Sequence, residues 1–143
     1  VHFFSMANAA ARREILEQYP FETQIQYSED IEWSYRLRQA GLRIAYVPEA
    51  AATHSHNYSL RQSYKRHFGE GKAEAWIFRQ GELNTSLLRY CLLPFGMEVL
   101  RDLSWGVRRG SMEAILHSVP LRAVQKWARW QGVRAGMKNH ATD

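Results

Sequence analysis

The clearest regular pattern of hydrophobic and polar positions lies at residues 29–40, where it has the period of an α-helix. Ser28 precedes this stretch and suits an N-cap, while Gly41 follows it and suits the C-terminal end of a helix. Glu29 and Asp30 place two carboxylates in the first turn, where the first backbone N–H groups favour negative charge. The pattern therefore predicts one short helix that begins at Glu29.

The two faces of this predicted helix differ in the carboxylate that they carry. With about 100° between successive residues, Asp30 falls on the apolar side together with Trp33 and Leu37. Glu32 falls on the opposite side with Arg36, four residues further on, so these two side chains can form an ion pair. The pattern thus predicts that Asp30 points the way the apolar face points and that Glu32 does not.

Short apolar segments predict strands before and after this helix. Residues 1–11 open with an apolar run. Residues 43–47 carry apolar side chains at both odd and even positions, which indicates a strand buried on both faces. Residues 50–56 are mostly small or polar and are interpreted as a strand or an extended segment. Residues 12–18 have a helical pattern that Pro20 closes.

The second half of the chain has a helical pattern. Ser59 and Gln62 form a capping-box sequence at the start of one predicted helix. After that helix, apolar residues again recur at helical spacing, and a last helix is predicted from Met112 to about Gly132, around Pro120. Breaks in this pattern are predicted at Pro94, Gly96, Gly106 and Gly110.

Composition bounds the class of protein. At 143 residues with 45% hydrophobic content, the chain could bury about two thirds of its unfolded surface as one domain. Cys91 is the only cysteine, so no intrachain disulfide can form, and it is expected to be a small buried hydrophobe. No apolar run is long enough to span a bilayer. The chain starts at Val1 without an initiator Met, and we expect it to be a fragment.

The net charge of +5 is unevenly distributed. Residues 1–60 carry five Lys or Arg and seven Asp or Glu, whereas residues 61–143 carry fourteen and seven, so the second part is basic enough to seek a negatively charged partner. Near its end lies a segment with the composition of a helix that lies on an anionic membrane. A packed helical hairpin or a homodimer contact would explain this segment equally well. The segment contains Trp127, Arg129, Trp130 and Arg134.

The order of motifs around the predicted central helix resembles that of a known family. Glu-Asp-x-Glu-Trp-x-x-Arg at residues 29–36 is followed by Ala-Gly, by Tyr-x-Pro-Glu-Ala at residues 46–50, and by His-Ser-His-Asn-Tyr-Ser-Leu-Arg-Gln at residues 54–62. This order resembles the C-terminal half of a family 2 glycosyltransferase catalytic domain, and it is most similar to bacterial rhamnosyltransferases. The resemblance implies an α/β fold class: the C-terminal portion of a GT-A (nucleotide-diphospho-sugar transferase) domain at residues 1–80, then a mainly α-helical basic extension at residues 81–143.

The resemblance also implies roles for individual residues. Asp30, with Glu29 beside it, corresponds to the Asp that acts as general base on the acceptor hydroxyl. His54 or His56 corresponds to a histidine that can hold a divalent metal, Mg or Mn, at the donor diphosphate. The histidines are two residues apart, so in an extended chain they point to opposite sides, and only one is expected to bind the ion. Taken without the resemblance, the carboxylates could simply complement the helix dipole, and the histidines could be ordinary hydrogen-bonding residues.

Four further residues are candidates for substrate binding. Asn8 and Arg12 match a segment that lines the pocket near the acceptor and the metal in the resembled family, although Asn8 could equally cap a helix. Arg61 could reach a donor phosphate from the first turn of its helix, although solvated surface charge is an alternative role. Trp33, on the apolar face of the central helix, completes the set.

The leading interpretation is a fragment of an inverting glycosyltransferase in cell-surface polysaccharide synthesis. It would transfer a sugar, with L-rhamnose as the expected choice, from a nucleotide-diphosphate donor to a glycan or lipid-linked acceptor. The Asp-x-Asp motif that such enzymes use for the donor is absent from the sequence, so the chain alone is expected to be inactive. The resemblance implies a cytoplasmic protein, peripheral at the inner face of the plasma membrane. The alternative is a non-catalytic basic helical module that binds an anionic membrane or, less readily because no RNA-binding motif is recognisable, nucleic acid.

Overall fold

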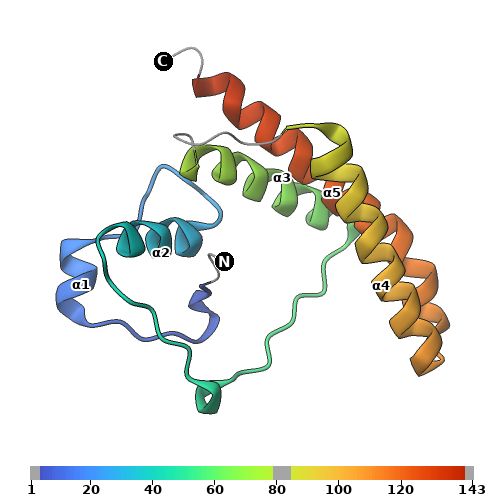
Figure 1. The fold of residues 1–143 in the computed structure, drawn as a ribbon, viewed down its shortest axis with the longest axis horizontal. Coiled ribbons are helices and arrows are strands. Elements are labelled where there is room, and N and C mark those ends of the chain that lie inside the picture. The colour runs from blue at the N-terminus through green and yellow to red at the C-terminus, as the bar shows by residue number, and fades with distance from the viewer. Residues whose placement is uncertain (1–3, 79–84, 141–143) are drawn as a thin grey trace. The chain divides into compact units, whose positions relative to one another are not determined.

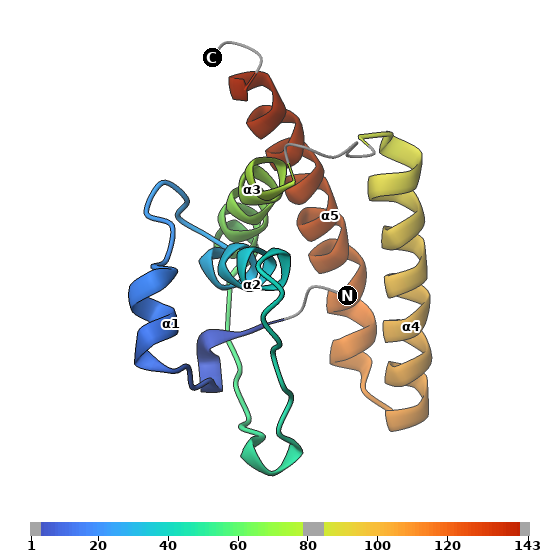
Figure 2. The same ribbon diagram turned by 60° about the vertical axis from the view of Figure 1, so that its left-hand side comes forward.

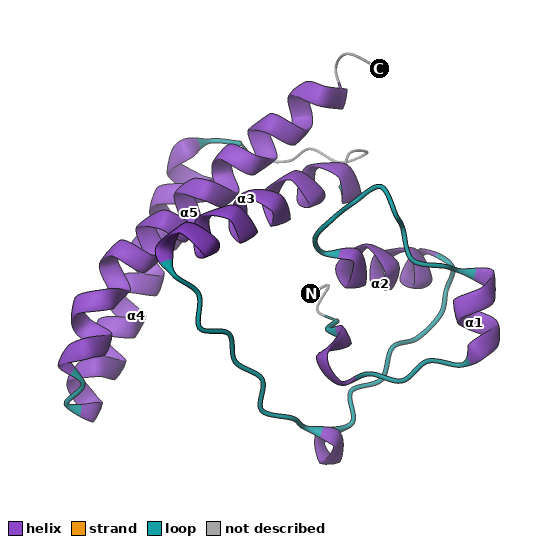
Figure 3. Cartoon of the chain, turned by 180° about the vertical axis from the view of Figure 1, so that it is seen from behind, coloured by secondary structure: helices purple, strands orange, loops and turns teal. Residues whose placement is uncertain are grey.

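The computed structural model describes residues 4–78 and 85–140. The chain divides into two compact units, unit 1 (residues 1–57) and unit 2 (residues 58–143), and each is described by itself (Figure 1). Every regular element in the described ranges is a helix, as the colouring of Figure 3 shows. In the same ranges, no helix is both long and apolar enough to cross a membrane.

The predicted α/β fold class is wrong for this chain, because the described residues contain no strand. A β-strand needs a neighbouring strand to pair with its backbone groups, and the described part of the chain offers none to the three predicted segments. Residues 43–47 form an irregular segment in which Ile44, Tyr46 and Val47 are exposed rather than buried on both faces. An apolar run therefore identified neither a strand nor a buried position here.

The other two predicted strands are also irregular. The first three residues of the opening run lie outside the described ranges, and its remaining part contains a short 3₁₀ helix, η1 (Met6–Asn8). Ala50 ends a second 3₁₀ helix, η2 (Pro48–Ala50), and residues 51–56 follow it as a loop. Both 3₁₀ helices contribute contacts to the candidate site.

Unit 1 is organised around α2 (Glu29–Gln39), whose bounds agree with the predicted helix. Ser28 occupies the N-cap position, although its side chain makes no capping hydrogen bond, and Gly41 follows the C-terminal end. Gly41 has a φ of 77°, a left-handed conformation that glycine adopts without strain. The N–H of Leu42 then closes the last turn on the carbonyl of Leu37 at 3.0 Å.

An aromatic cluster forms the core of unit 1. Trp33 is 2% exposed, and its ring centroid lies 5.5 Å from that of Phe4 and 5.1 Å from that of Phe21. Its Nε1 donates a hydrogen bond to the carbonyl oxygen of Tyr19 at 2.6 Å. Tyr19 directly follows α1 (Arg13–Gln18), so this cluster holds α2 against the chain that precedes it.

Unit 2 is a bundle of three long helices. Figure 2 shows α5 between α3 and α4, and α5 packs against each of them. The predicted capping box is confirmed, because Gln62 N donates to Ser59 Oγ at 3.3 Å and Ser59 N donates to Gln62 Oε1 at 2.9 Å. The elements are α3 (Leu60–Ile77), the π-helix η3 (Leu87–Leu92), α4 (Leu93–Arg109) and α5 (Met112–His140).

Of the four predicted breaks, only Gly110 ends a helix. It has a φ of 63°, which again suits glycine. Pro94 lies in the first turn of α4, directly after the π-helix η3, and the helical conformation continues through it. The other two glycines lie inside α4. The last helix passes through Pro120 and continues to His140, beyond its predicted end.

The α3 and α5 helices pack backbone to backbone at glycines. A Cβ atom placed on Gly71 would lie 2.2 Å from the carbonyl oxygen of Arg129, and one placed on Gly132 would lie 2.1 Å from that of Phe68. The two helices can approach this closely only because neither position carries a side chain. This contact joins α3 to α5 within unit 2, and the predicted domain boundary at residue 80 stays a prediction.

Ion pairs inside unit 2 use several of its basic residues. Arg122 Nε of α5 lies 2.6 Å from Asp102 Oδ2 of α4, and Lys126 Nζ lies 2.5 Å from Glu98 Oε1. These positive charges are thus matched by carboxylates of the neighbouring helix.

The segment expected to lie on a membrane also makes contacts within the bundle. Arg129 Nε lies 2.9 Å from Glu74 Oε2, and Trp130 Nε1 donates to the carbonyl oxygen of Thr85 at 3.0 Å. The guanidinium of Arg134 lies over the Trp130 ring, 4.6 Å from its centroid. The tryptophan and arginine content of this segment therefore stabilises unit 2 itself.

The Asp102–Arg122 pair predicts how stability depends on pH. The hydrogen bond from Arg122, together with its positive charge, lowers the pKa of the Asp102 carboxyl below its ordinary value of 3.8. Because the folded-state pKa is the lower one, the pair stabilises the protein above about pH 4, and this contribution is lost as the pH falls through the folded-state value. We expect Asp102→Asn to lower the free energy of unfolding by up to about 1 kcal/mol at pH 7 and by much less near pH 2.

Urea unfolding at the two pH values measures this difference. Glu113→Gln is the matched control, because it removes an exposed carboxylate at the start of α5 and should have little effect at either pH. An equal loss from Asp102→Asn at both pH values would contradict the prediction.

Candidate functional site

Asp30 lies in the first turn of α2 and is partly exposed. Its Oδ1 accepts a hydrogen bond from Ile31 N at 2.8 Å, and its Oδ2 accepts one from Met6 N at 3.4 Å. Two residues earlier, Ser28 has a φ of 60°, which is uncommon outside glycine, so the chain turns sharply just before the carboxylate. Backbone groups thus orient both oxygens of a carboxylate that solvent can reach.

Asn8 belongs to the surroundings of Asp30. It ends η1, the 3₁₀ helix whose first residue is Met6. The side-chain amide of Asn8 donates a hydrogen bond to the carbonyl oxygen of Ala50 in η2, 42 residues further along the chain. The 3₁₀ helix η1 therefore contacts both the first turn of α2 and η2.

His54 and His56 contact each other on the loop that follows η2. Their Nε2 atoms are 2.6 Å apart, and their rings meet edge to face with centroids 4.2 Å apart. The prediction that they point to opposite sides is wrong, because the loop at residues 51–59 brings the two rings into contact. Both side chains are exposed.

This histidine pair does not make a complete site for the predicted Mg or Mn ion. Mg²⁺ demands octahedral geometry and, like other hard cations, takes mostly oxygen ligands. Nowhere in the described ranges do three or more His, Cys, Asp or Glu side chains gather as a metal site would require. The described residues alone do not supply a full set of metal ligands, so the divalent metal stays a prediction.

The remaining predicted residues lie in different surroundings. Arg12 is an exposed residue at the start of α1, and Glu29 is exposed at the start of α2. Trp33 lies in the aromatic core and has almost no surface left for a substrate. Arg61 is exposed in the first turn of α3, within unit 2. Substrate binding by these residues stays a prediction. The burial of Trp33 argues against a role for its side chain in binding substrate.

Glu32 is a buried carboxylate that the sequence pattern assigned to the wrong face. It is 3% exposed, and its Oε1 lies 2.5 Å from Arg36 Nε, which confirms the predicted ion pair. Arg36 also donates to the carbonyl oxygen of Pro20 at 2.6 Å, so the pair ties α2 to the segment before it. Within the described residues, Glu32 Oε2 has no hydrogen-bond partner. The spacing of four residues indicated the pair, but nothing in the pattern indicated its burial.

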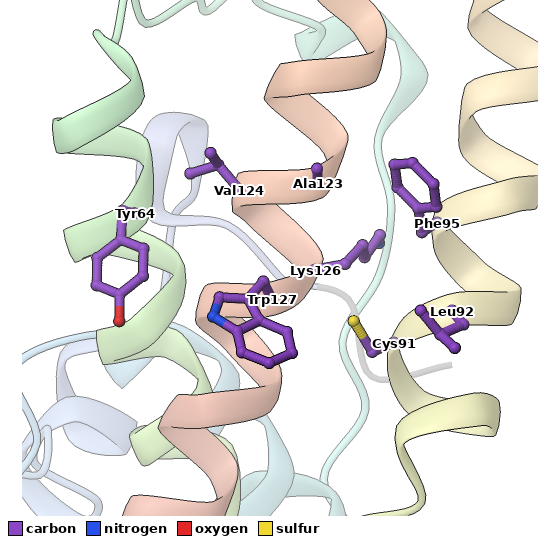
Figure 4. Close-up of a pocket in the computed structure, with 8 residues that line it drawn as sticks. All are labelled: Tyr64, Cys91, Leu92, Phe95, Ala123, Val124, Lys126 and Trp127. Atoms are coloured by element: carbon purple, nitrogen blue, oxygen red, sulfur yellow. The ribbon is translucent and has the colours of Figure 1, made fainter.

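Unit 2 contains an apolar cavity of about 400 Å³ that no sequence motif indicated (Figure 4). Lys126 contributes its hydrocarbon stem, because its ammonium group is held by Glu98. Cys91 is 4% exposed, and burial raises the pKa of its thiol, which agrees with the small buried hydrophobe predicted for it. The cavity suits an apolar group rather than a reacting one. Tyr64, Leu92, Phe95, Ala123, Val124 and Trp127 complete its lining.

Comparison with known proteins agrees with the resemblance in the sequence. The family model described as "Glycosyltransferase like family 2" matches residues 1–73. The O-antigen chain rhamnosyltransferase WbaN of Salmonella anatum is 41% identical over 83 residues, which cover 54% of this chain and 26% of that protein. The O-antigen chain rhamnosyltransferase RfbN of Salmonella typhimurium is 37% identical, with the same coverage.

The chain spans about a quarter of the length of these two relatives, and no solved structure matches it. The family match covers more than half of the chain. It includes Asp30, Asn8 and both histidines, the residues from which the site above is built. The chain therefore belongs to the glycosyltransferase-like family 2.

Proposed function

We propose that the whole protein carrying this chain transfers a sugar from a nucleotide-diphospho-sugar donor to a hydroxyl group of a glycan acceptor. Family membership supports this proposal, as do the two relatives, which are both O-antigen chain rhamnosyltransferases. The observation that carries it is the placement of Asp30, an accessible carboxylate at a helix N-terminus with both oxygens oriented by backbone N–H groups.

Asp30 is the general base in this proposal. As the acceptor hydroxyl oxygen attacks the anomeric carbon of the donor sugar, its proton passes to the Asp30 carboxylate. The glycosidic bond forms while the bond from the anomeric carbon to the diphosphate breaks, and the nucleotide diphosphate leaves with the electron pair. This single displacement inverts the configuration at the anomeric carbon.

The proposed donor sugar is L-rhamnose, and the proposed acceptor is a glycan or a lipid-linked intermediate of O-antigen synthesis. The names of the two relatives support both choices. The proposed place of reaction is the cytoplasm, at the inner face of the plasma membrane.

A transfer assay with the whole protein tests this proposal. Nucleotide-diphospho-L-rhamnose and, in parallel, the corresponding glucose and galactose donors are offered with an O-antigen glycan acceptor. We expect rhamnose transfer to exceed that of either other sugar by about tenfold or more. A preference for another sugar would overturn the rhamnosyl assignment, and a lack of transfer from all three donors would overturn sugar transfer itself.

A further inference from the structure

The outer face of α4 is apolar. Four of its side chains recur at spacings of four, three and seven residues and so share one face of the helix. Ser104 lies on the same face between Leu100 and Val107, and its Oγ accepts a hydrogen bond from Arg108 at 2.7 Å. Soluble monomers rarely gather large exposed apolar side chains on one helix face in this way. We call these residues the α4 stripe; they are Leu93, Met97, Leu100 and Val107, with exposed fractions of 52, 65, 69 and 70%.

The acidic residues of α4 lie on the opposite side of the helix. Its sequence contains two, Glu98 and Asp102, and these pair with Lys126 and Arg122 of α5. Figure 2 shows α4 at the edge of the bundle, with α5 along one side of it. The negative charges of α4 are thus directed into the bundle and already matched there.

Positive charge and an aromatic side chain flank the stripe. With about 100° between residues, Arg101 and Arg108 fall beside it, and both are exposed. Arg101 keeps 68% of its side chain exposed although it lies 3.6 Å from Asp102. Trp105, further round the helix, is 54% exposed. The outer side of α4 therefore combines apolar, cationic and indole groups, and α4 contributes no carboxylate to it.

We propose that α4 lies in the interface of an anionic lipid bilayer. The α4 stripe enters the boundary between head groups and acyl chains, and Arg101 and Arg108 bind lipid phosphates. The helix lies along the surface, because no helix of the described ranges is long and apolar enough to span a membrane. This interaction is a property of unit 2 and does not depend on sugar transfer by the whole protein.

Charge favours a bilayer over a second copy of the chain. In a symmetric dimer the same patch meets itself, so a contact through the stripe would bring the arginines of both copies into one interface. Like charges disfavour such a contact, and the carboxylates of α4, Glu98 and Asp102, are already paired with α5. An anionic lipid surface satisfies both the apolar and the cationic part of the patch.

Co-sedimentation of the whole protein with lipid vesicles tests the proposal. The probes are vesicles of pure phosphatidylcholine and vesicles with one third phosphatidylglycerol. We expect the anionic vesicles to bind at least tenfold more tightly, and the preference to weaken as salt is raised. The double variant Met97→Gln, Leu100→Gln should lose about tenfold or more in binding to them.

Two further variants make this result specific. Leu88→Gln with Met137→Gln also replaces one exposed leucine and one exposed methionine of unit 2, outside the stripe, and should bind as the parent does. Arg101→Gln with Arg108→Gln should lose about tenfold on anionic vesicles and nothing on neutral ones. Circular dichroism checks the fold of each variant. If the stripe variant is unfolded, the binding of the arginine variant to anionic vesicles tests the proposal in its place.

Equal binding of the parent to both kinds of vesicle would overturn the proposal, as would undiminished binding by the stripe or the arginine variant. Sedimentation velocity without lipid supplies the remaining outcome. If the parent is a dimer and the stripe variant is a monomer, this face binds a second copy of the chain instead of a bilayer. A failed transfer assay would leave the vesicle result unaffected, so the two proposals fail separately.

Discussion

Asparagine in place of Asp30 is expected to lower the turnover number of the whole protein by about 10²–10⁴-fold, the contribution of one positioned acid or base. The amide has nearly the shape of the carboxylate, and its oxygen can still accept a backbone hydrogen bond. It cannot accept the proton of the attacking hydroxyl. Binding of the nucleotide-diphospho-sugar should change little, because Asp30 acts on the acceptor. Steady-state transfer rates and donor Kd values from calorimetry measure the two effects separately.

Glu29→Gln is the matched control for this variant. Glu29 lies in the same turn of α2, carries the same charge and is more exposed than Asp30. We expect its replacement to change turnover by less than about fivefold, in line with a charge that only complements the helix dipole. Undiminished turnover in Asp30→Asn, or an equal loss in both variants, would remove Asp30 from the role of base.

Alanine in place of Gly132 is expected to lower the free energy of unfolding of unit 2 by about 3 kcal/mol or more. The added Cβ would lie 2.1 Å from the carbonyl oxygen of Phe68 and 3.1 Å from the Cα of Gly71. Both are backbone atoms of α3, so no side-chain rotation relieves the clash and the two helices must separate. Buried residues such as Val133 would then lose packing. Urea unfolding followed by circular dichroism gives the loss.

Gly96→Ala is the control for this loss, because it makes the same change inside another helix. A Cβ at Gly96 meets no atom within 4 Å in the described structure, and alanine favours a helix over glycine. We expect this variant to be neutral or more stable by up to about 1 kcal/mol. If Gly132→Ala were as stable as Gly96→Ala, the close approach of α3 and α5 would be wrong.

Local signals in the sequence predicted local structure well. The bounds of α2 followed from Ser28 and Gly41, the capping box of α3 from Ser59 and Gln62, and the Glu32–Arg36 pair from a spacing of four residues. Each of these features depends on side chains or backbone groups within one turn of each other, so a short stretch of sequence determines it. The position of Asp30 at a helix N-terminus was predicted for the same reason.

Features that depend on distant parts of the chain were missed. The predicted strand at residues 43–47 required a partner strand that the described residues do not provide. Glu32 is buried where Arg36 contacts the Pro20 carbonyl of the segment before α2, and the close packing at Gly132 depends on α3. No short window of sequence contains these partners. The motif order, in contrast, identified the family, because the resemblance extends over many residues at once.

A structure of the whole protein with a non-reacting donor analogue and a glycan acceptor gives the most direct measurement, the distance from the Asp30 carboxylate to the acceptor hydroxyl. For a base that accepts the proton of that hydroxyl, we expect about 2.6–3.2 Å between the two oxygens. If Asp30 instead lies remote from the acceptor, or another carboxylate occupies that position, Asp30 is not the base.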